Sequence, residues 1–74
     1  MNFDALDAEV RLAQANRDSG RLMEIYFDLG KAELPRNEDA AAFLLVQALV
    51  YGLEAGRDEA EEIHAILKGL GREE

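Results

Sequence analysis

Apolar residues recur at the spacing of amphipathic helices in four segments of the chain, which short polar stretches separate. The first segment, about 4–17, carries one stripe of residues three or four positions apart, so that their side chains share one helix face. The second, about 21–33, has two stripes: Leu22, Ile25, Tyr26 and Leu29 form one, and Met23, Phe27 and Leu34 form the other. These stripes lie about 100–140° apart around the helix, so one packed neighbour cannot cover both.

The third segment is apolar at almost every position from Ala40 to Leu53. It begins after Asn37, a favoured N-cap residue, and Glu38 and Asp39 suit the positive end of the helix that follows. A helix that is hydrophobic all round is normally buried on all sides. In a monomer of this size every helix has a solvent side, so the third segment predicts a surplus of apolar surface.

Polar residues and glycines mark where these helices begin and end. The fourth segment, about 58–69, starts with Asp58 and Glu61 at the spacing of a capping box. Ser19 lies in a turn-like run and is predicted to cap the second helix, while Ser19–Gly20 interrupts the first.

The ends of the last three helices are predicted from proline and glycine. Pro35 should move Leu34 out of the helical conformation and so end the second helix. Gly56 is predicted to end the third helix in the left-handed conformation, and Gly71 is predicted to end the fourth. The short connections favour antiparallel neighbours. We therefore expect one all-α domain, 1–74, of four helices arranged as two antiparallel helical hairpins.

Composition narrows the chemistry. The 74 residues contain no cysteine, which excludes disulfides, thiolate metal sites and a cysteine nucleophile. Ser19 and His64 are the single serine and histidine, and we expect a non-catalytic chain without a cofactor. The net charge of −8 argues against binding to nucleic acid or an anionic membrane. The N-terminus lacks the features of a signal peptide and the apolar run 40–53 is too short to span a bilayer, so we expect a cytoplasmic protein.

The apolar surplus predicts a contact surface for another protein chain. A domain this small, without disulfides, gains stability from association. We expect a homodimer whose interface draws on both middle helices, through Met23, Phe27, Leu34, Phe43, Leu44 and Val50. Two alternatives stay open: the third helix lies at the centre of a compact monomer, or the surface receives a helix of a different protein.

Two further functions are consistent with the charged residues. The excess of carboxylates suits an acidic inhibitor, of the nucleic-acid-mimic or immunity type, that occupies a basic surface of another protein. Glu61 and His64 have the Glu-x-x-His spacing of carboxylate metal sites in helical bundles. However, His64 falls at the edge of the buried face and Glu61 points outward. A second histidine is lacking, so such a site would have to be shared across a dimer.

About half of the chain resembles a tetratricopeptide or Sel1-like helical repeat. Ala48, Tyr51, Gly56 and Ala60 stand where such a unit has a small residue, a tyrosine, a turn glycine and an alanine of its second helix. The resemblance implies a helical hairpin that binds other proteins. Such repeats usually need three or more copies to be stable. A chain of this length has room for only two, so it would require a partner or a dimer.

Overall fold

The computed structural model describes residues 3–71, which form four α-helices and no strand. These are α1 (Phe3–Ala15), α2 (Ser19–Glu33), α3 (Glu38–Glu54) and α4 (Glu59–Gly69). The predicted all-α class is confirmed, and each predicted boundary lies within about two residues of the observed one, as expected where helix ends fray. Of the helices in residues 3–71, none is long and apolar enough to cross a membrane.

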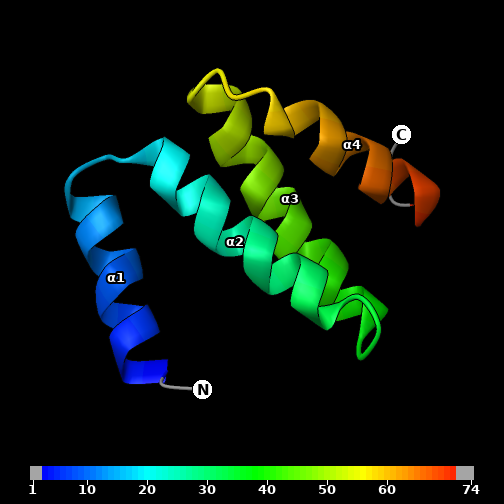
Figure 1. Ribbon diagram of the computed structural model, residues 1–74, viewed down its shortest axis with the longest axis horizontal. Coiled ribbons are helices and arrows are strands. Elements are labelled where there is room, and N and C mark those ends of the chain that lie inside the picture. Colours follow the sequence, from blue (N-terminus) through cyan, green and yellow to red (C-terminus); the bar gives the residue numbers. More distant parts are fainter. Residues whose placement is uncertain (1–2, 72–74) are drawn as a thin grey trace.

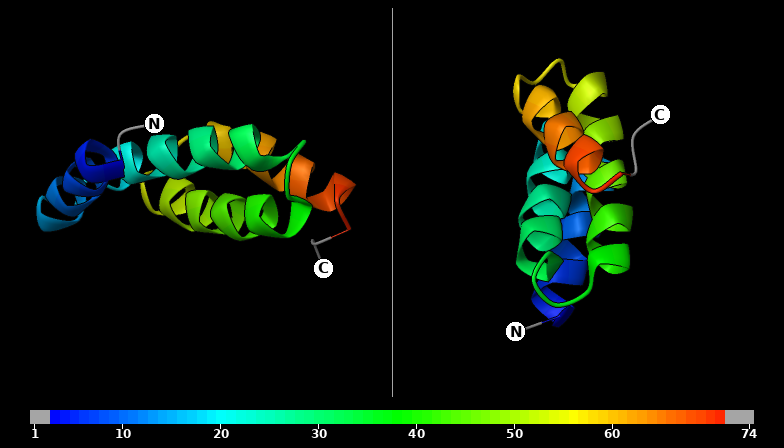
Figure 2. Two further views of the ribbon diagram at one scale, coloured as in Figure 1. Left: turned by 90° about the horizontal axis from the view of Figure 1, so that it is seen from below. Right: turned by 90° about the vertical axis from the view of Figure 1, so that its right-hand side faces the viewer.

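The helix α3 is the centre of the packing. Its most extensive contact is with α2, which lies beside it, and it also packs against α4 (Figure 1). By contrast, α1 contacts α2 only modestly and diverges from it. In both views of Figure 2, α2 and α4 cover the same broad side of α3 and leave its opposite side open.

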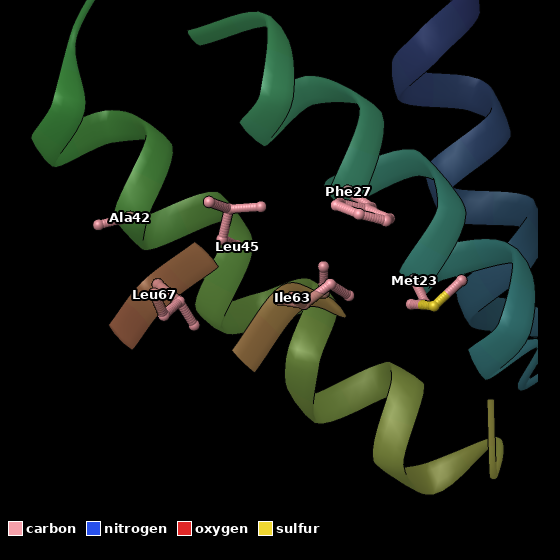
Figure 3. Packing of buried hydrophobic residues seen from close by; sticks show 7 residues of the cluster. Met23, Phe27, Ala42, Leu45, Ile63 and Leu67 are labelled. Atoms are coloured by element: carbon pink, nitrogen blue, oxygen red, sulfur yellow. The ribbon is translucent and has the colours of Figure 1, made fainter. Parts of the chain in front are cut away.

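The core lies between α2, α3 and α4. It is built from Met23 and Phe27 of α2, Ala42, Leu45 and Ala48 of α3, and Ile63 and Leu67 of α4 (Figure 3). The side chains of Met23, Leu45 and Ile63 are fully buried. Removal of this apolar surface from water is the main contribution to folding that these elements can make.

Both stripes of α2 are buried or half-buried because this helix has neighbours on two sides. Met23 and Phe27 face α3 and α4 (Figure 3), whereas Ile25 lies beside a hollow that it lines together with Leu6 of α1. The prediction that Met23 and Phe27 belong to an exposed interaction patch is therefore wrong: they are 0% and 6% exposed within a single chain. Leu34, from the same predicted set, is half-buried and packs against the core.

Several predicted helix ends differ from those observed. Ser19 is the first residue of α2 and Asp18 is its N-cap, since the Asp18 carboxylate accepts a hydrogen bond of 3.0 Å from the backbone N–H of Arg21. Gly20 also lies inside α2, and the break after α1 falls instead at Arg17, which has a φ of 54°. Leu34 keeps a helical conformation before Pro35, held by the hydrogen bond from its N–H to the carbonyl of Gly30.

At the N-termini of α3 and α4, one predicted side-chain cap is confirmed and the other is not. Asn37 caps α3, because its side-chain oxygen accepts a hydrogen bond of 3.1 Å from the N–H of Ala40. Asp58 has a helical backbone and makes no side-chain cap hydrogen bond, so the predicted capping box is wrong. Gly56 has a φ of 66°, which confirms the predicted left-handed end of α3, and Gly71, with a φ of 75°, follows the end of α4 as predicted.

Candidate functional site: an apolar face on α3

One side of α3 presents apolar side chains to solvent. Phe43 is 64% exposed, Val46 41%, Val50 49% and Leu53 66%. We call these four residues the α3 stripe. They are spaced by three, four and three positions and fall within about 80° of one another around the helix. Because exposed apolar patches usually mark contact surfaces, the α3 stripe is the leading candidate for a functional surface.

A groove adjoins the stripe at Phe43. It has a volume of about 680 Å³ and lies where α1, the end of α2 and the start of α3 come together. Its lining residues are Leu6, Leu29, Ala32, Glu33, Arg36, Ala40, Phe43 and Leu44. The groove exists because α1 diverges from α2 and leaves the ends of α2 and α3 partly uncovered (Figure 1). Phe43 lines the groove and also begins the stripe, so the two form one continuous apolar surface.

The predicted interface residues therefore separate into two groups. Phe43 and Val50 lie on the α3 stripe, and the half-buried Leu44 lines the groove. Met23, Phe27 and Leu34 belong to the core or pack against it. Val46 and Leu53 were missing from the predicted set, although their positions three residues from Phe43 and Val50 would have placed them on the same face.

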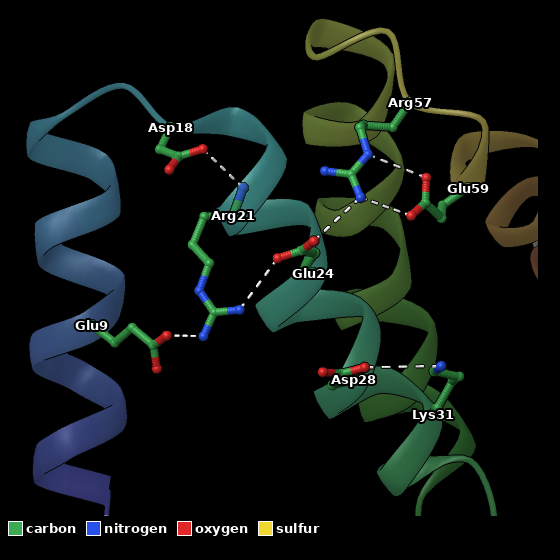
Figure 4. A network of polar contacts seen from close by, with 8 residues as sticks. All are labelled: Glu9, Asp18, Arg21, Glu24, Asp28, Lys31, Arg57 and Glu59. Carbon is green, nitrogen blue, oxygen red and sulfur yellow. Dashed lines mark hydrogen bonds and ion pairs between the residues drawn. The ribbon is translucent and has the colours of Figure 1, made fainter.

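A network of charged side chains joins α1, α2 and the start of α4 (Figure 4). The Arg57 guanidinium donates hydrogen bonds to both carboxylate oxygens of Glu59, at 3.2 and 2.8 Å, and one of 3.2 Å to Glu24. Arg21 pairs with Glu24 at 3.2 Å and also with Glu9 of α1. The network thus links helices that are far apart in the sequence.

These bonds shift the pKa values of two groups. The hydrogen bonds from Arg57 hold the pKa of the Glu59 carboxyl below its ordinary value. In turn, the hydrogen bonds to Glu59 and then Glu24 raise the pKa of Arg57. Both side chains are charged at neutral pH and engaged with each other, an arrangement that favours a structural role over proton transfer.

The two candidate metal ligands lie on the surface. Glu61 and His64 are both exposed on α4, and for Glu61 this agrees with the prediction from its position on the helix. The two residues line a shallow hollow with Leu49, Leu53 and Ala60. Within residues 3–71, no three His, Cys, Asp or Glu side chains gather closely enough to hold a metal ion.

The side chains of the α3 stripe and of the groove are mostly apolar, so they are suited to contact with another molecule and not to catalysis. The charged residues among those that line the groove are Glu33 and Arg36, which lie 3.8 Å apart as an ion pair. Comparisons of the chain with protein-family models, with curated proteins and with solved structures find no match. The physical character of this surface is therefore the guide to function.

Proposed function

We propose that the chain is a small, acidic, non-catalytic protein-interaction module that forms a homodimer through the α3 stripe. The observation that carries this proposal is the exposure of Phe43, Val46, Val50 and Leu53 on one face of a helix whose opposite face is buried in the core. Burying such a face against another chain removes apolar surface from water at about 25 cal/mol per Å². The stripe lies on a preformed helix that is packed on the core, so binding requires the ordering of side chains but not the folding of a segment.

A repeat-like helical hairpin fits the same proposal. Under the resemblance to tetratricopeptide and Sel1-like units, α3 and α4 would be the two helices of one unit. Several observations support this pairing: Ala48 and Ala60 are buried, and Gly56 forms the left-handed turn between the helices. Tyr51 stacks on Tyr26 of α2, with the ring centroids 5.8 Å apart. Small residues at these positions let neighbouring helices approach, as stacked helical units require.

The test is the mass of the chain in solution, measured by sedimentation and light scattering from low to high micromolar concentration. We expect a species of twice the 8.2 kDa chain mass. Phe43→Glu and Val50→Glu should shift the mass to that of the monomer while the helical circular dichroism is retained, because both side chains are about half exposed or more. A wild-type chain that stays monomeric throughout this range would overturn the proposal.

Leu12 supplies the matched control. It is 63% exposed, nearly the same as Phe43, but it lies on α1 and outside the stripe. Leu12→Glu should therefore leave the dimer mass unchanged. Equal loss of association in Leu12→Glu and Phe43→Glu would indicate non-specific hydrophobic contact in place of a defined surface.

A further inference from the structure

The spacing along the α3 stripe is symmetric. From Phe43 the next stripe residues follow after three, four and three positions, and the same intervals are met when the stripe is read backwards from Leu53. Intervals of three and four are those at which one helix seats its side chains between those of another in a coiled coil. A reversible order of intervals means that the stripe fits a copy of itself running in the opposite direction.

This symmetry makes the stripe complementary to a second copy of itself and indicates the orientation of the pair. Resting on the proposed function, we infer that the α3 stripe binds the α3 stripe of a second copy of this chain in antiparallel orientation. The two-fold axis crosses the stripe midway between Val46 and Val50, at the level of position 48 along the helix. Phe43 then lies opposite Leu53 of the second copy, and Val46 lies opposite its Val50. Such a contact is isologous, because each surface supplies the same residues to the other, and it closes at two chains.

The charges on α3 favour the antiparallel over the parallel orientation. All three charged residues of α3, which are Glu38, Asp39 and Glu54, are acidic. A parallel pair in register would bring each of these carboxylates next to its own copy, and like charges at close range destabilise the contact. The antiparallel pair places each carboxylate at least three positions, about 4.5 Å along the axis, from the nearest carboxylate of the other copy, and it also makes the two helix dipoles antiparallel.

The groove enlarges the contact in the same orientation. Phe43 belongs to both the stripe and the groove, so the second copy's α3 ends beside the groove when its Leu53 reaches Phe43. The apolar wall formed by Leu29, Ala32 and Leu44 then lies next to that end. The contact extends in this way beyond four side chains on each copy.

Disulfide cross-linking tests the orientation, because the chain has no cysteine of its own. Phe43→Cys is mixed with nitrogen-15-labelled Leu53→Cys under mild oxidation, and the products are weighed by mass spectrometry. We expect the mixed disulfide to exceed either homodisulfide at least several-fold. In the antiparallel pair, position 43 of one copy is ten residues from position 43 of the other, about 15 Å along the axis, well beyond the span of about 4.4–6.8 Å between the Cα atoms of a disulfide.

The outcomes separate the orientation from the function. Homodisulfides of Phe43→Cys in excess would show a parallel pair, and a dimer mass without any of these disulfides would show another interface; each overturns the inference. The proposed function stands in the first case, where the dimer still depends on the stripe. A monomeric wild-type chain overturns both. Leu12→Cys mixed with Leu53→Cys is the control, and it should give no excess of mixed disulfide.

Discussion

Gly30 of α2 lies directly against Leu45 of α3, so closely that a Cβ atom on Gly30 would come within 2.8 Å of Cγ and Cδ2 of the leucine. Leu45 is fully buried in the core, so a methyl group on Gly30 would force packed side chains or the helices to shift. Gly30→Ala should therefore lower the free energy of unfolding by about 1–3 kcal/mol, as overpacking does in other cores. This occurs even though alanine favours a helix by about 1 kcal/mol over glycine. Urea unfolding followed by circular dichroism measures the change.

Gly69 of α4 provides the control for Gly30. A Cβ atom there would meet nothing within 4 Å. Gly69→Ala should consequently raise the free energy of unfolding, by at most about 1 kcal/mol, because only the helix preference acts. Equal stabilisation by both alanine substitutions would contradict the close packing of α2 on α3.

The docking of α4 depends on Ile63, which is fully buried in the core. Ile63→Ala should cost about 2–5 kcal/mol, since it removes apolar contacts and leaves a cavity. Leu53→Ala, at a side chain that is largely exposed, should leave the unfolding of the dilute chain nearly unchanged. Thermal unfolding at low concentration compares the two, and a similar cost for both would contradict the division between core and stripe.

The side-chain caps of α3 and α4 should differ in their contribution to stability. Asn37→Ala removes the hydrogen bond to the N–H of Ala40 and should cost about 1 kcal/mol. Asp58→Ala removes no cap hydrogen bond, so it should cost clearly less. Chemical unfolding of both variants tests this, and a larger loss for Asp58→Ala would show that the capping box forms in solution.

Apolar periodicity predicted where the four helices lie because it reports which side chains share a face, and that property is local. It did not predict which neighbour covers each face. Met23 and Phe27 looked like surplus because one partner helix cannot cover both stripes of α2, yet α2 is enclosed by α3 and α4 on one side and by α1 on another. Which elements meet is a property of the whole chain.

The candidate surface was predicted in part for a related reason. The excess of apolar residues in the third segment indicated that some of them remain exposed, and Phe43 and Val50 do. The exposed face itself depends on how α2 and α4 lie across α3, which fixes Val46 and Leu53 as its other members. Likewise, the sequence did not predict that Asp18 rather than the adjacent Ser19 caps α2, because aspartate and serine are about equally favoured as N-cap residues.

Salt should strengthen the proposed dimer. Each chain carries a net charge of −8, so two copies repel one another at low ionic strength. Added sodium chloride screens that repulsion, whereas the burial of the α3 stripe does not depend on charge. The dimer dissociation constant measured by sedimentation should therefore fall as salt increases. Binding to a basic target, as an acidic inhibitor would show, has the opposite dependence, and weaker self-association in high salt would contradict an apolar interface.

The ion pair between Arg57 and Glu59 should make the stability of the chain depend on pH in a defined direction. The hydrogen bonds from Arg57 lower the pKa of Glu59 in the folded chain. A carboxyl group whose pKa is lower in the folded than in the unfolded chain stabilises the fold above its unfolded pKa, and this stabilisation is lost as the pH falls through the folded value. Glu59→Gln should thus lower the unfolding temperature at neutral pH, and the difference from wild type should disappear below the ordinary glutamate range.

Glu61→Gln isolates the contribution of Arg57. Glu59 and Glu61 both lie in the first turn of α4, so each substitution removes one negative charge from the positive end of the same helix. Glu59 also receives the two hydrogen bonds from Arg57. Thermal unfolding across acidic and neutral pH should therefore show a larger loss at neutral pH for Glu59→Gln than for Glu61→Gln. If the two variants followed the same pH profile, the helix dipole would account for the whole effect and the Arg57 pair would contribute nothing measurable.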